Sequence, residues 1–328
     1  MPTPPPRPPN CTPSLLPFSP FKKGTIPVGT APHTTPIAYE IHGHGPVHIV
    51  LLMGFISSMY AWRPQIQYFA HEEEYSVCIL DNRGYGFSGK PWGWYSTAIF
   101  ARDVVEVLEG LGWVEPKSVH VVGVSMGGMI SLELAALIAD RIASLCLTST
   151  CAKLIQPVRT RTEAVTNWIS ILTPKLSHRS QAEHAADSIF PRKWLKDHDH
   201  RYPEYKTNRE RVVQSMVTRF TFLPKQPTHA TLSQGLACLS HNVPTSNLRA
   251  IAEAIPDIVA CTGTDDQLIN PICTDLLIEG FGGEREGVRK IIFEGAGHAV
   301  LEERDEEYNK TVEELIERAE NRYGRSVE

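Results

Sequence analysis

Short apolar runs that alternate with amphipathic stretches constrain the fold of this chain most strongly. Buried parallel strands read as nearly continuous apolar segments, and the helices that cover such a sheet carry apolar residues on one side. We predict central strands over residues 48–53, 75–80, 119–124, 144–148 and 258–262, and a strand nearer the edge over 289–293. Amphipathic helices are expected over 96–111, 126–138 and 306–322. This order is typical of an α/β fold with a mostly parallel central sheet flanked by helices.

Two segments interrupt this pattern and divide the 328-residue chain. Residues 1–36 are rich in proline, which removes backbone donors, so we expect a flexible N-terminal arm. Residues 152–248 are helical in character and contain no convincing buried strand, and we interpret them as an inserted helical cap. The α/β core is then formed by residues 37–151 and 249–328.

The composition argues against several classes of function. The net charge is −5 and Lys and Arg are scattered among acidic residues, so no basic stripe is available for a nucleic acid. No stretch approaches the roughly 18 apolar residues of a transmembrane helix. Seven cysteines lack the paired spacing of zinc or redox sites, so we expect no metal or other cofactor, and free thiols in a reducing, cytoplasmic compartment. The sequence indicates no oligomeric state.

The pentapeptide Gly123-Val-Ser125-Met-Gly127 lies between an expected strand and an expected helix. A nucleophile on so sharp a turn needs small residues two positions before and after it, and glycine occupies both positions. The pattern G-x-S-x-G also occurs by chance, but its position favours a nucleophilic Ser125. Because an alcohol is a weak nucleophile at neutral pH, Ser125 needs a histidine base and an acid that orients this base.

Two downstream sites could supply these partners. His298 follows the expected edge strand in a glycine-rich turn, which would let its imidazole reach over the carboxyl edge of the sheet. An exposed turn histidine is the alternative interpretation. Asp265 and Asp266 follow the expected strand that ends at residue 262, and both are candidates for the acid. Aspartate is, however, also common in ordinary surface turns.

These residues resemble the motifs of the α/β-hydrolase superfamily, and most closely those of its small esterase and lactonase branch, over residues 37–322. Further matching motifs are Leu51-Leu-Met-Gly54-Phe55, Asp81-Asn-Arg83-Gly-Tyr-Gly-Phe-Ser88, Gly263-Thr-Asp-Asp266 and Gly297-His298. The resemblance implies an α/β-hydrolase fold, in which Ser, Asp and His follow one another along the chain. The family's G-x-x-D pattern selects Asp266 over Asp265, so the implied triad is Ser125, Asp266 and His298.

The resemblance also implies an oxyanion hole formed by two backbone N–H groups, those of Met126 and Phe55. This chain has Met53-Gly54 where the family commonly has His-Gly. It therefore lacks a side chain that often braces the loop, although the backbone donor itself remains.

Other polar residues receive weaker assignments. His241 resembles a position that could face the substrate, with an ordinary packed histidine as the alternative. Asp81 and Arg83 are interpreted as structural, in a turn and ion-pair network that supports the carboxyl end of the sheet. The cluster Asp197-His-Asp-His200 is interpreted as a solvated surface of the cap rather than a metal site.

The sequence therefore predicts a serine hydrolase that cleaves a small-molecule ester or lactone through an acyl-enzyme on Ser125. Apolar residues of the cap favour small to medium apolar substrates: Trp168, Ile169, Ile171, Leu172, Trp194 and Leu232. Thioesterase, C–C bond hydrolase, hydroxynitrile lyase and acyltransferase activities remain alternatives, because each can use the same triad. A non-catalytic relative that binds a small ligand or a protein partner is a further alternative.

Overall fold

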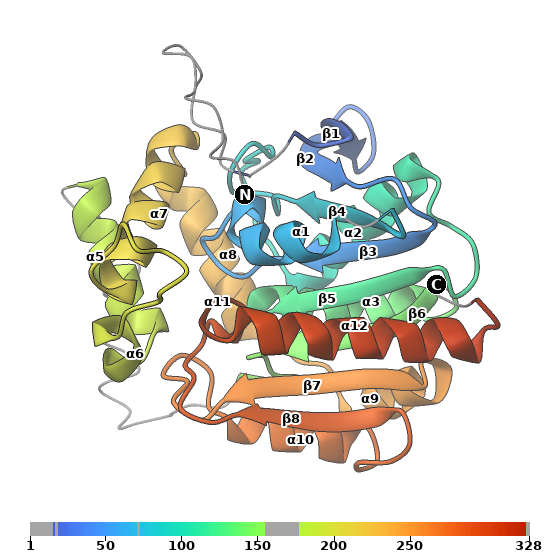
Figure 1. The fold of residues 1–328 in the computed structure, drawn as a ribbon. Coiled ribbons are helices and arrows are strands. Elements are labelled where there is room, and N and C mark those ends of the chain that lie inside the picture. The colour runs from blue at the N-terminus through green and yellow to red at the C-terminus, as the bar shows by residue number, and fades with distance from the viewer. Residues whose placement is uncertain (1–15, 17–18, 71–72, 155–176, 326–328) are drawn as a thin grey trace.

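The computed structural model describes residues 16, 19–70, 73–154 and 177–325. Its central sheet has the strand order β1-β2-β4-β3-β5-β6-β7-β8 (Figure 1). The strands are β1 (Lys22–Val28), β2 (Thr35–His42), β3 (Val47–Leu52), β4 (Tyr75–Leu80), β5 (Val119–Val124), β6 (Ile142–Thr148), β7 (Asp257–Gly263) and β8 (Val288–Phe293). Neighbouring strands from β4 to β8 pair in parallel. The predicted α/β class is confirmed, and all six predicted strands are present.

The N-terminal boundary of the sheet differs from the prediction. Residues 22–36, expected in a flexible arm, form β1 and the start of β2, and β1 pairs antiparallel with β2. The sequence of β1, KKGTIPV, has no apolar run because most of this edge strand is exposed. Proline is tolerated there because an edge strand leaves some N–H groups unpaired. Residues 1–15, 17 and 18 of the predicted arm lie outside the described residues.

Helices cover both faces of the sheet (Figure 1). On one face lie α1 (Arg63–Phe69), preceded by the short η1 (Met59–Trp62), together with α11 (Val300–Glu303) and α12 (Asp305–Arg322). On the other lie α2 (Thr97–Leu111), α3 (Met126–Ile138), α9 (Thr245–Ala254) and α10 (Ile272–Gly280). Alternate residues of β3 belong to the two apolar clusters: Ile49 and Leu51 to one, Val50 and Leu52 to the other. Burial on both faces explains why the central strands are apolar throughout.

The segment predicted as a cap contains α5 (His178–Ile189), α6 (Arg192–Lys196), α7 (Asn208–Phe222) and α8 (Thr228–Ser240). These helices lie beside the end of the sheet toward which the parallel strands point (Figure 1). The chain leaves and re-enters the core at one place, where Lys153 and Asn242 form an isolated bridge. The last predicted cap residues, 245–248, instead start α9, which packs on the core through Leu248 and Ile251. Residues 155–176, with Trp168, Ile169, Ile171 and Leu172, lie outside the described part of the chain.

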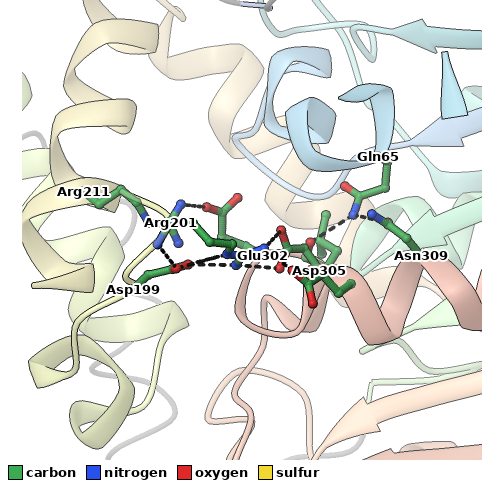
Figure 2. A network of polar contacts seen from close by, with 9 residues as sticks. Gln65, Asp199, Arg201, Arg211, Glu302, Asp305 and Asn309 are labelled. Carbon is green, nitrogen blue, oxygen red and sulfur yellow. Dashed lines mark hydrogen bonds and ion pairs between the residues drawn. The ribbon is translucent and has the colours of Figure 1, made fainter. Parts of the chain in front are cut away.

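A polar network ties the α5–α8 segment to the core (Figure 2). Arg201, in the connection between α6 and α7, donates to Asp199 at 2.7 Å and to Asp305 at the start of α12 at 3.0 Å. Arg211 of α7 donates to Glu302 of α11 at 2.5 Å. Both core partners lie just after the predicted base His298. The segment is therefore anchored next to the candidate site.

Each cysteine that the structure describes is buried and takes part in no disulfide: Cys78, Cys146, Cys151, Cys238, Cys261 and Cys273. This agrees with the expectation that the thiols act as small apolar side chains in the core. Within the described ranges, no helix has the length and apolar character needed to cross a membrane.

A buried ion pair at the amino-terminal edge of the sheet gives a test of the fold. The Asp257 side chain is fully buried at the start of β7 and accepts from Nε of Arg322 at 2.7 Å. We expect Arg322→Ala to lower the free energy of unfolding by about 2 kcal/mol, because it leaves a buried carboxylate without its partner. Denaturant unfolding would measure this, with Lys310→Ala on the exposed face of α12 as the control. Equal stability of the two variants would contradict a stabilising ion pair between Asp257 and Arg322.

Candidate active site

Ser125 occupies a strained turn between β5 and α3. Its backbone has φ 57° and ψ −123°, a conformation that non-glycine residues rarely adopt. A Cβ atom on Gly127 would lie 1.9 Å from the carbonyl oxygen of Leu52, and one on Gly123 would lie 2.3 Å from Oγ of Ser131. Gly127 is therefore required by the close approach of β3, and Gly123 by the close approach of α3.

Backbone hydrogen bonds hold this turn in place. The N–H of Ser125 donates to the carbonyl of Thr148 at the end of β6, at 2.9 Å. The carbonyl of Ser125 accepts from Oγ1 of Thr150 at 2.8 Å. The half-buried serine is thus fixed at the carboxyl edge of the sheet, where loops after several strands meet.

Asp266 and His298 meet at the same edge. Asp266 follows β7 and His298 follows β8, and Oδ2 of Asp266 lies 2.8 Å from Nδ1 of His298. The other carboxylate oxygen accepts from the N–H groups of Leu268 at 2.8 Å and Ile269 at 3.0 Å. Because an ionised carboxylate can only accept, Nδ1 of His298 must carry a proton, which leaves Nε2 free to accept one. Asp265 is exposed, and the structure places only Asp266 against His298.

The loop after β3 passes directly beside Ser125. A Cβ atom on Gly54 would lie 3.0 Å from Cβ of Ser125 and 3.5 Å from its Oγ. Phe55 follows in this loop and is half-buried. Met126, fully buried, is the first residue of α3, so its N–H lies at the positive end of the helix. The two predicted oxyanion donors thus come from segments on either side of the serine.

Two residues that follow β4 brace this loop. The sequence analysis assigned Asp81 to a structural role and made no assignment for Asn82. Asn82 donates from Nδ2 to the carbonyl of Met53 at 2.9 Å. Asp81, fully buried, accepts from the N–H groups of Met59 and Phe87, both at 2.9 Å. Burial raises the pKa of Asp81 to about 6. These contacts hold the loop after β3 against the loop after β4.

Arg83 pairs with a residue that the sequence did not indicate. Its Nε donates to Oδ2 of Asp103 on α2 at 2.5 Å, and the carbonyl of Arg83 accepts from Gln234 of α8 at 2.8 Å. Both contacts fix the loop after β4 to neighbouring helices, which agrees with the structural interpretation of Arg83.

His241 is packed against α2 and α3. It is 3% exposed, and its Nδ1 lies 2.9 Å from Oγ1 of Thr97 on α2 and 3.7 Å from Glu133 on α3. Burial lowers its pKa to about 4, so the ring is neutral at physiological pH. These contacts are those of the packed histidine given as the alternative.

The Asp197–His200 cluster forms local contacts. The rings of His198 and His200 lie 4.7 Å apart, and Asp199 accepts from Arg201. Across the described part of the chain, no group of three or more His, Cys, Asp or Glu residues is placed to hold a metal. Trp194 stacks on Phe190 within the α5–α8 segment, and Leu232 is 48% exposed. Neither observation identifies a substrate pocket.

The sequence analysis missed Glu303. This residue is 7% exposed, and both its carboxyl oxygens lie 3.0 Å from the amide nitrogen of Gly297, next to His298. It stands in the charged run Glu302-Glu-Arg-Asp-Glu-Glu307, which reads as a solvated surface. Nothing in this run distinguishes Glu303 from its charged neighbours in the sequence.

Comparisons with known proteins identify the family and the fold. A family model described as the alpha/beta hydrolase fold matches residues 47–305. A protein of Variovorax paradoxus named putative carbamate hydrolase RutD is 28% identical over 247 residues, which is 75% of this chain and 84% of that protein. Further matches to proteins of that name are 37 or 38% identical and span 39 to 41% of those proteins' length.

Two solved structures have the same fold. A thermophilic esterase from Thermogutta terrifontis aligns with a TM-score of 0.69 at 20% identity, over 91% of this chain and 99% of that chain. An enol-lactonase from Burkholderia xenovorans LB400 aligns with a TM-score of 0.66 at 22% identity, over 86% of this chain and 96% of that chain. At such identities the likeness establishes the fold alone.

The crowding at Gly127 gives a test of the turn. We expect Gly127→Ala to lower the free energy of unfolding by about 3 kcal/mol, because the added methyl group would overlap the backbone of β3. The matched control is Gly235→Ala in α8, where a Cβ atom would lie 3.6 Å from Phe55, an ordinary contact. That change should be neutral or stabilising by about 0.5–1 kcal/mol, as alanine is the better helix former. Thermal unfolding measures both, and similar losses would argue against the crowded turn.

Proposed function

Because the chain belongs to the α/β-hydrolase family, we propose that it is a serine hydrolase that cleaves carboxylic esters or lactones through an acyl-enzyme on Ser125. The observation that carries the proposal is the 2.8 Å contact between Asp266 and His298 at the sheet edge that also holds the strained Ser125. Acyl transfer needs a serine at the edge of the sheet, a histidine with one nitrogen left to accept a proton, and a buried carboxylate that orients this histidine.

In the proposed mechanism, Nε2 of His298 takes the proton from Oγ of Ser125 as this oxygen attacks the carbonyl carbon of the substrate. The N–H groups of Met126 and Phe55 stabilise the negative charge that develops on the carbonyl oxygen. His298 then gives the proton to the leaving alcohol, and the acyl group remains on Ser125. Water, activated by His298 in the same way, releases the acid. Asp266 keeps Nδ1 protonated and stabilises the imidazolium.

The α5–α8 segment is proposed to act as a cap over this site. Its Ile189 carbonyl accepts from the N–H of His298 at 3.0 Å, and Gln234 lies 3.4 Å from the N–H of Ile56 in the loop that carries Phe55. The segment therefore contacts the loops on both sides of Ser125. Closure over the site would exclude water and strengthen the oxyanion contacts.

Aromatic side chains between cap and core support a small to medium apolar substrate. Tyr60, Phe87 and Phe222 form a cluster with ring centroids 5.7 to 6.4 Å apart. Phe222 ends α7, whereas the other two belong to η1 and the loop after β4. The described thiols are buried and form no disulfide, which supports a reducing compartment, and we propose a cytoplasmic location.

A carbamate is the second candidate substrate. The Variovorax paradoxus relative that aligns with three quarters of this chain is named a putative carbamate hydrolase. A carbamate carbonyl can be attacked by the same serine, with the same stabilisation of the oxyanion. Substrate preference would then depend on the cap rather than on the triad.

Substitution of the nucleophile tests the proposal directly. We expect Ser125→Ala to lose at least about 10³-fold in turnover of p-nitrophenyl esters of graded acyl length, lactones or carbamates, because water cannot replace the positioned alcohol. A fluorophosphonate probe should label the wild-type protein at Ser125 and leave the variant unlabelled. Ser246→Ala, an exposed serine at the start of α9, is the control. Retained turnover in Ser125→Ala would rule out the acyl-enzyme.

The two adjacent aspartates give a second test. Asp266→Asn should reduce turnover about 10³- to 10⁴-fold, because an amide that donates to Nδ1 favours the wrong histidine tautomer. Asp265→Asn makes the same chemical change at an exposed position and should leave turnover within about twofold of the wild type. Steady-state rates on one p-nitrophenyl ester measure both. A larger loss in Asp265→Asn would reverse the assignment of the acid.

A further inference from the structure

A second carboxyl group is buried next to Asp266 and His298, and the mechanism described above does not use it. Glu303 ends the one-turn helix α11. Its two oxygens share the N–H of Gly297, each at 3.0 Å, and Gly297 immediately precedes His298. The carboxyl group thus holds the Ala296–Gly297 peptide, one residue before His298.

The segment that carries His298 is confined from two sides. On the cap side, the N–H of His298 donates to the carbonyl of Ile189 at the end of α5. A Cβ atom on Gly297 would lie 2.8 Å from that carbonyl oxygen and 3.1 Å from Oε1 of Glu303. Because the peptide fills the space between α5 and Glu303, loss of either contact would let His298 shift.

Helix α11 is itself fixed in place, so Glu303 has little freedom to move away. Gln65 of α1 donates from Nε2 to the carbonyl of Leu301 and to Oδ1 of Asn309, both at 2.9 Å (Figure 2). On the opposite side, Glu302 accepts from Arg211 of α7 (Figure 2). One helical turn therefore contacts the core, the cap and the histidine loop.

On the basis of the proposed function, we propose that Glu303 is a positioning residue, which holds His298 in line with Ser125 through the Gly297 amide and tunes the basicity of His298 through its own charge. This role does not require Glu303 to touch the substrate. It does require the carboxyl group to change its charge in the pH range where the enzyme works.

The surroundings of Glu303 place its ionisation in that range. Burial raises its pKa to about 8, and the negative charge of Asp266 acts in the same direction. The positive charge of Arg304 and the N–H groups of Gly297 and Ala299 act in the opposite direction. Glu303 is thus mostly neutral at pH 7 and becomes negative as the pH rises through about 8.

The direction of the effect follows from the charge. A negative Glu303 stabilises the imidazolium that forms when His298 takes the serine proton. The reactivity of Ser125 should therefore rise in a step near pH 8, as Glu303 becomes negative. A neutral residue at position 303 removes this step.

The experiment measures the second-order rate constant for labelling of Ser125 by a fluorophosphonate probe between about pH 6 and 10, on the full chain. Glu303→Gln keeps an acceptor for Gly297 and resembles the neutral acid. We expect it to react within about threefold of the wild type at pH 7 and to lack the step near pH 8. Glu303→Ala leaves the Gly297 amide without its acceptor and should react about 10- to 100-fold more slowly at every pH.

Glu307→Gln, an exposed residue of α12, makes the same charge change and should keep both the rate and the step. A Glu303→Gln variant that retains the step near pH 8, or a folded Glu303→Ala variant as fast as the wild type, would overturn the proposal. If Glu303→Ala does not fold, the pH profile of Glu303→Gln decides alone. A wild-type chain that is not labelled at all would instead refute the serine hydrolase itself, and the positioning role with it.

Discussion

The parallel pairing of β4, β3, β5, β6, β7 and β8 is the constraint on which the rest of the structure depends. Parallel strands require crossover connections, and these connections bury both faces of the sheet under helices. All the carboxyl ends then lie on one edge, where the chain must turn into the next helix. Residues that are far apart in sequence, such as Ser125 and His298, come to the same edge for this reason.

Buried polar contacts then convert this edge into a defined site. Each loop is held by an acceptor or donor from another loop: Asn82 on Met53, Thr150 on Ser125, and Glu303 on Gly297. An unpaired buried N–H or C=O group would cost about 1–3 kcal/mol, so these contacts leave the loops few alternative conformations. The same edge also receives the α5–α8 segment, through hydrogen bonds to the loops that carry His298 and Phe55. The α5–α8 segment and the two loops that carry His298 and Phe55 are therefore linked through one region.

Much of the fold was predictable because burial leaves a direct trace in the sequence. The central strands are apolar on both faces, and each predicted strand appears with its ends shifted by at most two residues. The strand β1 was missed because it lies at an edge, where exposed Lys, Thr and Pro replace the apolar run. Glu303 was missed for a related reason. Its neighbours in the charged run are exposed or half-buried, and no local property of the sequence shows that Glu303 alone is buried.

The sequence by itself determined the α/β class, the positions of β3 to β8 and the glycine-flanked turn at Ser125, because these depend on local periodicity and on residue size. The tertiary structure decided the contacts between segments: that Asp266 rather than Asp265 meets His298, that Asn82 braces the loop after β3, and that His241 faces α2 and α3. Such contacts depend on the register and tilt of elements distant in the chain. Hydrogen bonds are sensitive to fractions of an ångström, and no pattern of neighbouring residues encodes them.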